Sequence, residues 1–134
     1  MELVINREYG GFSLSLKGLY TYCLKKYGSA YIYEVKEQYH LIRVPYSDTL
    51  DRNKEYAVTP KDFGEEYFSP FVDQIIDLNI ERNDPALVET VKELGDKANG
   101  RCASLAIEEI DDKYRHRWEI DSEDGWESVQ ILDK

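Results

Sequence analysis

The stretch Glu81–Ile110, ERNDPALVETVKELGDKANGRCASLAIEEI, decides the fold because it predicts a helix followed directly by a strand. Asp84 stands where an N-cap belongs, and Pro85 follows at the first helical position. Apolar residues then recur at helical spacing and form the expected buried stripe, which is Leu87, Val88, Val91, Leu94 and Ala98. We expect Asn99-Gly100 to end this helix in the left-handed region. Cys102–Ile110 alternates with a period of two, which predicts a strand.

The N-terminal residues predict a strand, a tight break and another helix. Glu2–Asn6 contains a β-branched pair and predicts the first strand. Tyr9-Gly10-Gly11-Phe12 interrupts it, because two adjacent glycines permit positive φ and close backbone approach. Ser13 or Ser15 can cap the helix that follows, and Gly28 is expected to end it. The apolar residues of this helix share one face: Leu16, Leu19, Tyr20, Cys23, Leu24 and Tyr27.

The middle of the chain is less regular. Ala30–Val35 and Tyr39–Val44 are aromatic and β-branched runs that predict an antiparallel hairpin, and Glu55–Val58 predicts a short strand. Thr59–Ile80 is punctuated by prolines and a glycine, so we expect an irregular segment with a helical turn near Phe63 and a strand near Ile75. Long irregular segments in compact domains are often functional or interfacial.

The C-terminal residues complete the predicted fold class. Tyr114–Ile120 and Trp126–Leu132 predict two strands joined by a turn at Ser122–Gly125, since Asp-Gly is a typical hairpin turn pair. Strands outnumber helices, and few helices separate consecutive strands. We therefore predict an α+β fold, with a mostly antiparallel sheet of five to seven strands and two main helices packed on one face. The length of 134 residues fits a single domain, residues 1–134.

Composition narrows the classes of function. Hydrophobic residues make up 42% of the chain and charged residues 33%, which is typical of globular proteins. No apolar run reaches the roughly 20 residues of a membrane helix, and the first residues lack the pattern of a signal peptide. We therefore expect a cytoplasmic protein without a membrane partner. Cys23 and Cys102 are expected to be buried, reduced thiols, and neither cysteine has a Cys or His neighbour at metal-ligand spacing.

The acidic balance argues against direct nucleic-acid binding. The net charge is −10, whereas proteins that grip phosphate backbones carry clustered Lys and Arg. Most of the acid lies at one end: Leu105–Lys134 holds ten Asp or Glu and four Lys or Arg, a net −6. Two interpretations stay open for this segment. It is a solvated surface, or it imitates nucleic acid and occupies a DNA-binding protein.

No pattern of catalytic or cofactor-binding residues is found. The chain lacks a phosphate-binding P-loop, a dinucleotide fingerprint and a nucleophile elbow, so we expect no cofactor and no enzyme activity. Adjacent carboxylates such as Glu108-Glu109 are the background of an acidic chain. Neighbouring strand residues also point to opposite faces, so these two cannot share a site.

Two segments combine the residue types of a small-anion site. Asn6–Phe12 places the cation Arg7, the ring of Tyr9 and the Gly10-Gly11 backbone next to a helix start, which suits anion capture. Asn99-Gly100-Arg101 lies at a helix end. If the first strand pairs with the strand after the second helix, these segments converge. The Arg7 and Arg101 guanidinium groups could then hold phosphates while Tyr9 or Phe12 stacks on a base. The structural alternative is a tight strand-to-helix turn and a helix cap.

The same segments carry a resemblance. INREYGGFSLS (Ile5–Ser15) and Glu81–Ile110 resemble a family of small proteins encoded by tailed bacteriophages. The family pattern runs close to I-N-R-x-Y-G-G-F-x-L-S near the N-terminus and D-P-x-L-V-x-x-V-x-E-L-G-x-x-A-N-G in the C-terminal half. The match covers about 41 residues, and the end around Trp126 is similar, whereas Ala30–Ile80 has no counterpart.

The resemblance implies a function by association. Its members are similar to phage counter-defence proteins of the Thoeris anti-defence kind, which act as oligomeric sponges in the host cytoplasm. Such proteins sequester a nucleotide signal, a cyclic ADP-ribose isomer or a cyclic oligonucleotide, without cleaving it. The resemblance implies the ligand-binding residues Arg7, Tyr9, Gly10, Gly11, Phe12 and Asn99, to which the physical argument adds Arg101. The alternative is an acidic inhibitor that mimics nucleic acid and blocks a host protein.

Overall fold

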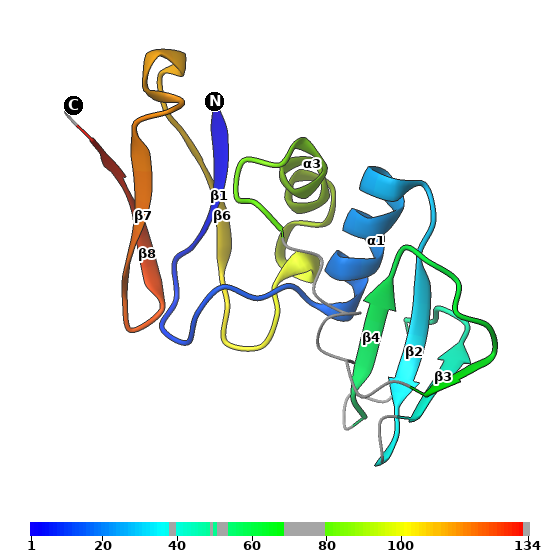
Figure 1. Ribbon diagram of the computed structural model, residues 1–134. Coiled ribbons are helices and arrows are strands. Elements are labelled where there is room, and N and C mark those ends of the chain that lie inside the picture. Colours follow the sequence, from blue (N-terminus) through cyan, green and yellow to red (C-terminus); the bar gives the residue numbers. More distant parts are fainter. Residues whose placement is uncertain (38–39, 49, 51–53, 69–79, 133–134) are drawn as a thin grey trace. The chain divides into compact units, whose positions relative to one another are not determined.

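The computed structural model describes residues 1–37, 40–48, 50, 54–68 and 80–132, and the chain forms two compact units (Figure 1). Unit 1 comprises Met1–Gly18 and Ile80–Lys134, and unit 2 comprises Leu19–Asn79. The predicted α+β class with antiparallel pairing is confirmed. Whether the two units act as the expected single domain stays a prediction.

Unit 1 is built around the strand pair β1 (Glu2–Asn6) and β6 (Leu105–Glu109). The two strands are antiparallel, with Val4 opposite Ile107 and Asn6 opposite Leu105. The predicted pairing of the first strand with the strand after the second helix is therefore confirmed. That strand starts at Leu105 and not at Cys102, because Cys102 has positive φ, and Cys102 is exposed whereas it was expected to be buried. Helix α3 (Pro85–Leu94) packs against both strands, and the core of the unit consists of these buried residues: Leu3, Val4, Ile5, Leu87, Val88, Val91 and Ala98.

Helix α3 begins as predicted and ends earlier than predicted. The Asp84 carboxylate accepts a hydrogen bond of 2.9 Å from the Ala86 N–H, as an N-cap does. The left-handed residue at its end is Gly95, with φ of 56°, and a 3₁₀ turn, η2 (Gly95–Ala98), follows. The expectation for Asn99-Gly100 was wrong, because Asn99 is extended. Gly100 is needed for another reason: a Cβ there would lie 2.7 Å from the Ser13 Cβ.

The predicted C-terminal hairpin is confirmed. Strands β7 (Trp118–Glu123) and β8 (Trp126–Ile131) are antiparallel, and the turn residues Asp124 and Gly125 both have positive φ. The first of these strands starts later than expected, because a short 3₁₀ turn, η3 (Asp112–Tyr114), precedes it. Strand β8 lies next to β1, so the hairpin belongs to unit 1.

Unit 2 contains a four-stranded antiparallel sheet in the order β4-β2-β3-β5. The strands are β2 (Tyr31–Val35), β3 (His40–Val44), β4 (Tyr56–Thr59) and β5 (Glu66–Phe68). The predicted hairpin is β2–β3. Strand β5 was not predicted, since it lies within the segment expected to be irregular. No helical turn forms near Phe63 among the described residues, and the strand expected near Ile75 lies outside them.

Helix α1 (Leu16–Tyr27) follows the N-terminal loop, and its predicted apolar face is only partly correct. Tyr22 and Cys23 are fully buried, whereas Leu24 and Tyr27 are exposed. The buried face is therefore centred on Tyr22, which the predicted stripe omitted. Within the sheet of unit 2, Tyr33 and Leu41 form a buried cluster with Tyr31, Val35, Phe63 and Tyr67 around it.

The described strands lie in three sheets of two, four and two strands, whereas one sheet of five to seven strands was expected. The cause is the pairing of β1 with β6, which are about 100 residues apart in the chain. Strand β1 therefore lies in a different sheet from β2, which pairs locally with β3 and with β4.

Candidate functional site

The two segments that the sequence singled out converge in unit 1. The Arg7 N–H donates a 2.8 Å hydrogen bond to the Ser104 carbonyl, and the Gly100 N–H donates one of 3.0 Å to the Ser13 carbonyl. The loop after β1 therefore runs beside the chain that leads from η2 into β6. This convergence follows from the β1–β6 register and was predicted with it.

The Gly10-Gly11 pair packs against the turn of the C-terminal hairpin. Gly10 has φ of 125°, and its N–H donates a 3.0 Å hydrogen bond to the Asp124 carbonyl. A Cβ on Gly125 would lie 2.6 Å from the Gly10 nitrogen, and a Cβ on Gly10 would lie 2.8 Å from the Cys102 Cβ. Glycine is therefore required on both sides of this contact, and the Gly10 N–H is already used within the fold.

Asn6 ties the loop to the hairpin and to β6. Its side chain is fully buried and donates hydrogen bonds of 2.7 and 2.8 Å to the carbonyls of Glu8 and Gly125. The side-chain oxygen of Asn6, Oδ1, accepts a 2.8 Å hydrogen bond from the Ser104 N–H. One amide thus satisfies three backbone groups from three segments, a role that the local sequence pattern did not reveal.

A buried ion pair lies beneath the loop and was also missed. The Arg82 guanidinium donates to both carboxylate oxygens of Glu127, with a distance of 2.7 Å for the Nη2–Oε2 bond. Glu127 is only 6% exposed and also accepts a 2.7 Å hydrogen bond from the Asn6 N–H. The Arg82 guanidinium carbon lies 3.7 Å from the centre of the Phe12 ring. That face of Phe12 is therefore covered by Arg82 and does not offer a surface to a base.

The exposed part of the candidate site is a pair of aromatic rings. Tyr9 is 60% exposed and Trp126 is 42% exposed, and their ring centres are 5.5 Å apart at an angle of 48°. Trp126 lies between Gly125 and Glu127, both of which contact the segments described above. The residues on both sides of Trp126 are therefore held in place by Asn6.

The two predicted cations, Arg7 and Arg101, differ in whether they form an ion pair. The Arg7 Nη2 lies 3.5 Å from a Glu108 carboxylate oxygen, and both side chains are partly exposed. Arg101 is exposed, and its guanidinium forms no ion pair within the part of the chain that the structure describes. The Asn99 side chain accepts a 2.9 Å hydrogen bond from the Leu105 N–H, so its oxygen serves the fold.

The structure thus divides the seven predicted site residues into two groups. Gly10, Phe12 and Asn99 have defined roles in holding the loop, and Gly11 lies against the hairpin turn. Tyr9, Arg7 and Arg101 present side chains to solvent. Only the second group is available to a ligand without rearrangement of the fold.

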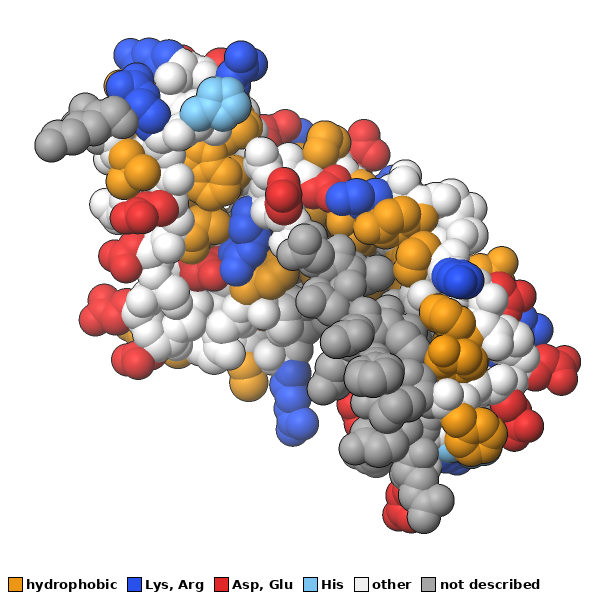
Figure 2. Space-filling view, in the orientation of Figure 1, with side chains coloured by type: hydrophobic (Ala, Val, Ile, Leu, Met, Phe, Trp, Pro, Cys, Tyr) orange, Lys and Arg blue, Asp and Glu red, His pale blue; other side chains and the backbone are white. Residues whose placement is uncertain are grey.

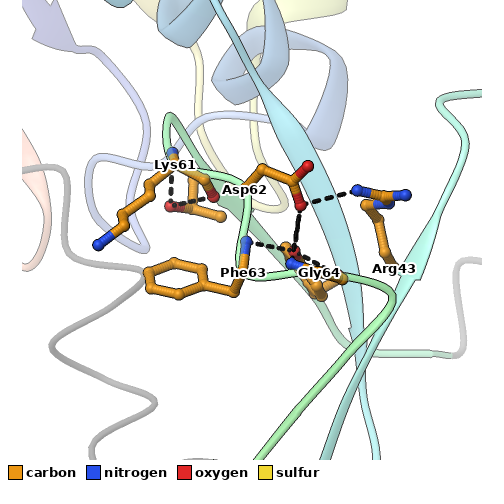
Figure 3. Close-up of polar contacts among 7 residues, drawn as sticks. Arg43, Lys61, Asp62, Phe63 and Gly64 are labelled. Carbon is orange, nitrogen blue, oxygen red and sulfur yellow. Dashed lines mark hydrogen bonds and ion pairs between the residues drawn. The ribbon is translucent and has the colours of Figure 1, made fainter.

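A polar cluster in unit 2 was not predicted (Figure 3). An Asp62 carboxylate oxygen accepts a 2.8 Å hydrogen bond from the Gly64 N–H and lies 2.7 Å from Arg43 Nη1. The Tyr33 hydroxyl donates to the Gly64 carbonyl and accepts from the Phe63 N–H. The Gly64 N–H, together with Arg43, holds the pKa of Asp62 below its ordinary value, whereas burial raises the pKa of Tyr33. These groups satisfy one another, so the cluster stabilises the loop before β5.

Two kinds of feature are absent from the described residues. They contain no group of three or more His, Cys, Asp or Glu side chains placed to hold a metal ion. None of their helices combines the length and apolar character needed to cross a membrane. Comparison of the chain with protein-family models, curated proteins and solved structures finds no match.

Proposed function

We propose that this chain is a phage counter-defence protein that binds and sequesters a nucleotide second messenger in the host cytoplasm without cleaving it. The observation that carries the proposal is the exposed Tyr9–Trp126 ring pair. Tyr9 lies on the loop where the two motif segments converge, and Trp126 lies in the adjacent C-terminal hairpin. A cyclic ADP-ribose isomer or a cyclic oligonucleotide offers a base for the rings and phosphates for the nearby cations.

The rings supply the contact with the base. Stacking of a base on an exposed aromatic side chain is worth about 1–3 kcal/mol. Both rings are exposed, Tyr9 by 60% and Trp126 by 42%. The backbone on both sides of Tyr9 is held by hydrogen bonds, to the Glu8 carbonyl from Asn6 and to the Asp124 carbonyl from Gly10. The backbone around Tyr9 therefore loses little conformational freedom when a ligand binds.

The cations supply the contact with phosphate. Gly10 contacts Cys102, so the residues that precede them, Tyr9 and Arg101, lie on neighbouring segments. Arg101 carries an exposed guanidinium. The Arg7–Glu108 pair is exposed, and such pairs contribute about 1 kcal/mol or less, so a phosphate can replace Glu108 as the partner of Arg7.

Titration calorimetry with a panel of cyclic oligonucleotides and ADP-ribose isomers tests the proposal. We expect binding of at least one member, with about tenfold weaker affinity for Tyr9→Ala and for Arg101→Ala. The matched controls are Tyr27→Ala, which removes an exposed tyrosine of unit 2, and Arg115→Ala, which removes an exposed arginine. Neither control should change the affinity.

The fate of the ligand separates sequestration from catalysis. Chromatography of the ligand released by denaturation should recover it unchanged. The proposal fails if no member of the panel produces heat, if the ligand is converted, or if the control variants weaken binding as much as the site variants. The resemblance also implies a homo-oligomer, and light scattering of the purified chain measures its mass in solution.

A further inference from the structure

The C-terminal hairpin has one outward face that no described element covers. Residues directly opposite each other in an antiparallel pair share a face, and the register sets Glu119 opposite Gln130, Asp121 opposite Ser128 and Glu123 opposite Trp126. All six are exposed, whereas Glu127 on the other face is buried. We call these six residues the acidic face, and Figure 2 shows acidic side chains along the edge of unit 1 where the hairpin lies.

The three carboxylates of the acidic face are available to a partner. Glu119, Asp121 and Glu123 form no ion pair with any described residue. Two other carboxylates of the acidic C-terminal segment are used within the fold, since Glu108 pairs with Arg7 and Asp112 with the N-terminal amine. On the acidic face, three carboxylates without an ion pair share one side of the hairpin.

The geometry of the acidic face is regular. Alternate residues on one strand are separated by about 6.8 Å, which is two rises of an antiparallel strand. The three acidic residues therefore follow one another along the same face of the strand. Trp126 stands at the end of this row, 42% exposed, opposite Glu123. Exposed tryptophan is a frequent anchor in protein interfaces, and its ring also attracts guanidinium groups.

We propose that the acidic face binds a protein surface that carries Lys and Arg in a row, the kind of surface that otherwise holds the phosphates of a nucleic-acid strand. Charge complementarity identifies this partner, because a row of free carboxylates repels nucleic acid itself and attracts the basic residues that bind it. Trp126 contacts one of the partner's guanidinium groups. This interaction shares Trp126 with the proposed nucleotide site, but its three carboxylates play no part in that site.

The probe for the test is a fluorescent ten-residue peptide in which arginine and serine alternate. In an extended peptide the arginines share one face and repeat at the spacing of the acidic face. A second peptide with five consecutive arginines followed by five serines has the same composition and charge. Fluorescence anisotropy at low salt should show at least threefold tighter binding of the alternating peptide.

Substitutions identify the face. The triple variant Glu119→Gln/Asp121→Asn/Glu123→Gln should bind the alternating peptide at least tenfold more weakly, and Trp126→Ala at least threefold more weakly. The control triple variant Glu81→Gln/Glu89→Gln/Asp96→Asn removes the same charge from exposed positions outside the face and should change the affinity less than twofold. Equal weakening by both triple variants, or equal affinity for the two peptides, would overturn the proposal, because net charge alone would then explain the binding.

Discussion

Replacing Arg82 by methionine tests whether the buried ion pair holds the hairpin against β1. Methionine keeps an apolar stem that can pack on Phe12, but it leaves the Glu127 carboxylate buried without its guanidinium partner. Removing one partner of a buried ion pair costs about 3–5 kcal/mol. The Arg82 side chain is 22% exposed, so water relieves part of the cost and the lower end applies, about 3 kcal/mol.

Urea unfolding followed by tryptophan fluorescence measures this loss. Both tryptophans, Trp118 and Trp126, lie in the hairpin, so the signal reports on unit 1. With a urea dependence of about 2 kcal/mol per molar, the unfolding midpoint should fall by about 1.5 M. The matched control Arg115→Met removes an exposed arginine and should cost less than about 0.5 kcal/mol.

A double variant identifies the cause of the loss. In Arg82→Met/Glu127→Gln the amide oxygen can still accept the hydrogen bond from the Asn6 N–H, but no unpaired charge remains buried. The double variant should therefore be more stable than Arg82→Met alone, by about 1–2 kcal/mol. If it is equally stable or less stable, the unpaired carboxylate is not what destabilises the single variant, and the reasoning is refuted.

Three further predictions follow from the described contacts. Gly125→Ala should destabilise unit 1 more than Gly95→Ala in the same urea assay. A Cβ on Gly125 would meet the backbone of the N-terminal loop, whereas a Cβ on Gly95 has open space, so that Gly95→Ala costs only the backbone strain of about 1–3 kcal/mol at its unusual φ and ψ. Equal losses would contradict this. The depressed pKa of Asp62 means that its contribution is present above the ordinary aspartate value of 3.8 and is lost as the pH falls through the lowered folded value. The protection of the amides in the loop before β5 against hydrogen exchange, taken relative to the intrinsic exchange rate at each pH, should fall in that acidic range and stay constant between pH 5 and 7. Iodoacetamide should label native Cys102, which is exposed, and spare Cys23, whose pKa burial raises to about 11; peptide mass spectrometry would contradict this by finding both labelled.

The sequence was most informative where one pattern covered a whole element. The helical spacing from Leu87 to Leu94 and the N-cap Asp84 located α3, and Asp124-Gly125 located the hairpin turn. The end of α3 was missed for a clear reason. Gly95 and Asn99-Gly100 are both suitable helix ends, and the sequence alone does not say which one the chain uses.

The roles of the site residues were harder to predict because their partners are distant in the chain. The motif around Gly10 suits an anion site as well as a tight turn, and the choice depends on Asp124 and Gly125, more than 110 positions away. Likewise, nothing near Phe12 indicates that Arg82 covers its ring. Local patterns carry no information about such contacts. The proximity of the segments that carry Tyr9 and Arg101, in contrast, followed from the predicted pairing of β1 with β6.

The pairing of β1 with β6 also has a consequence for the order in which the chain folds during synthesis. The partner of β1 leaves the ribosome about 100 residues after β1 itself, whereas the strands of unit 2 find all their partners within residues 31–68. Local pairings form sooner than distant ones. The sheet of unit 2 can therefore form before β6 has been synthesised, while the apolar residues of β1 are still unpaired. Those residues, Leu3, Val4 and Ile5, are the ones most exposed to chaperones and to aggregation on the nascent chain.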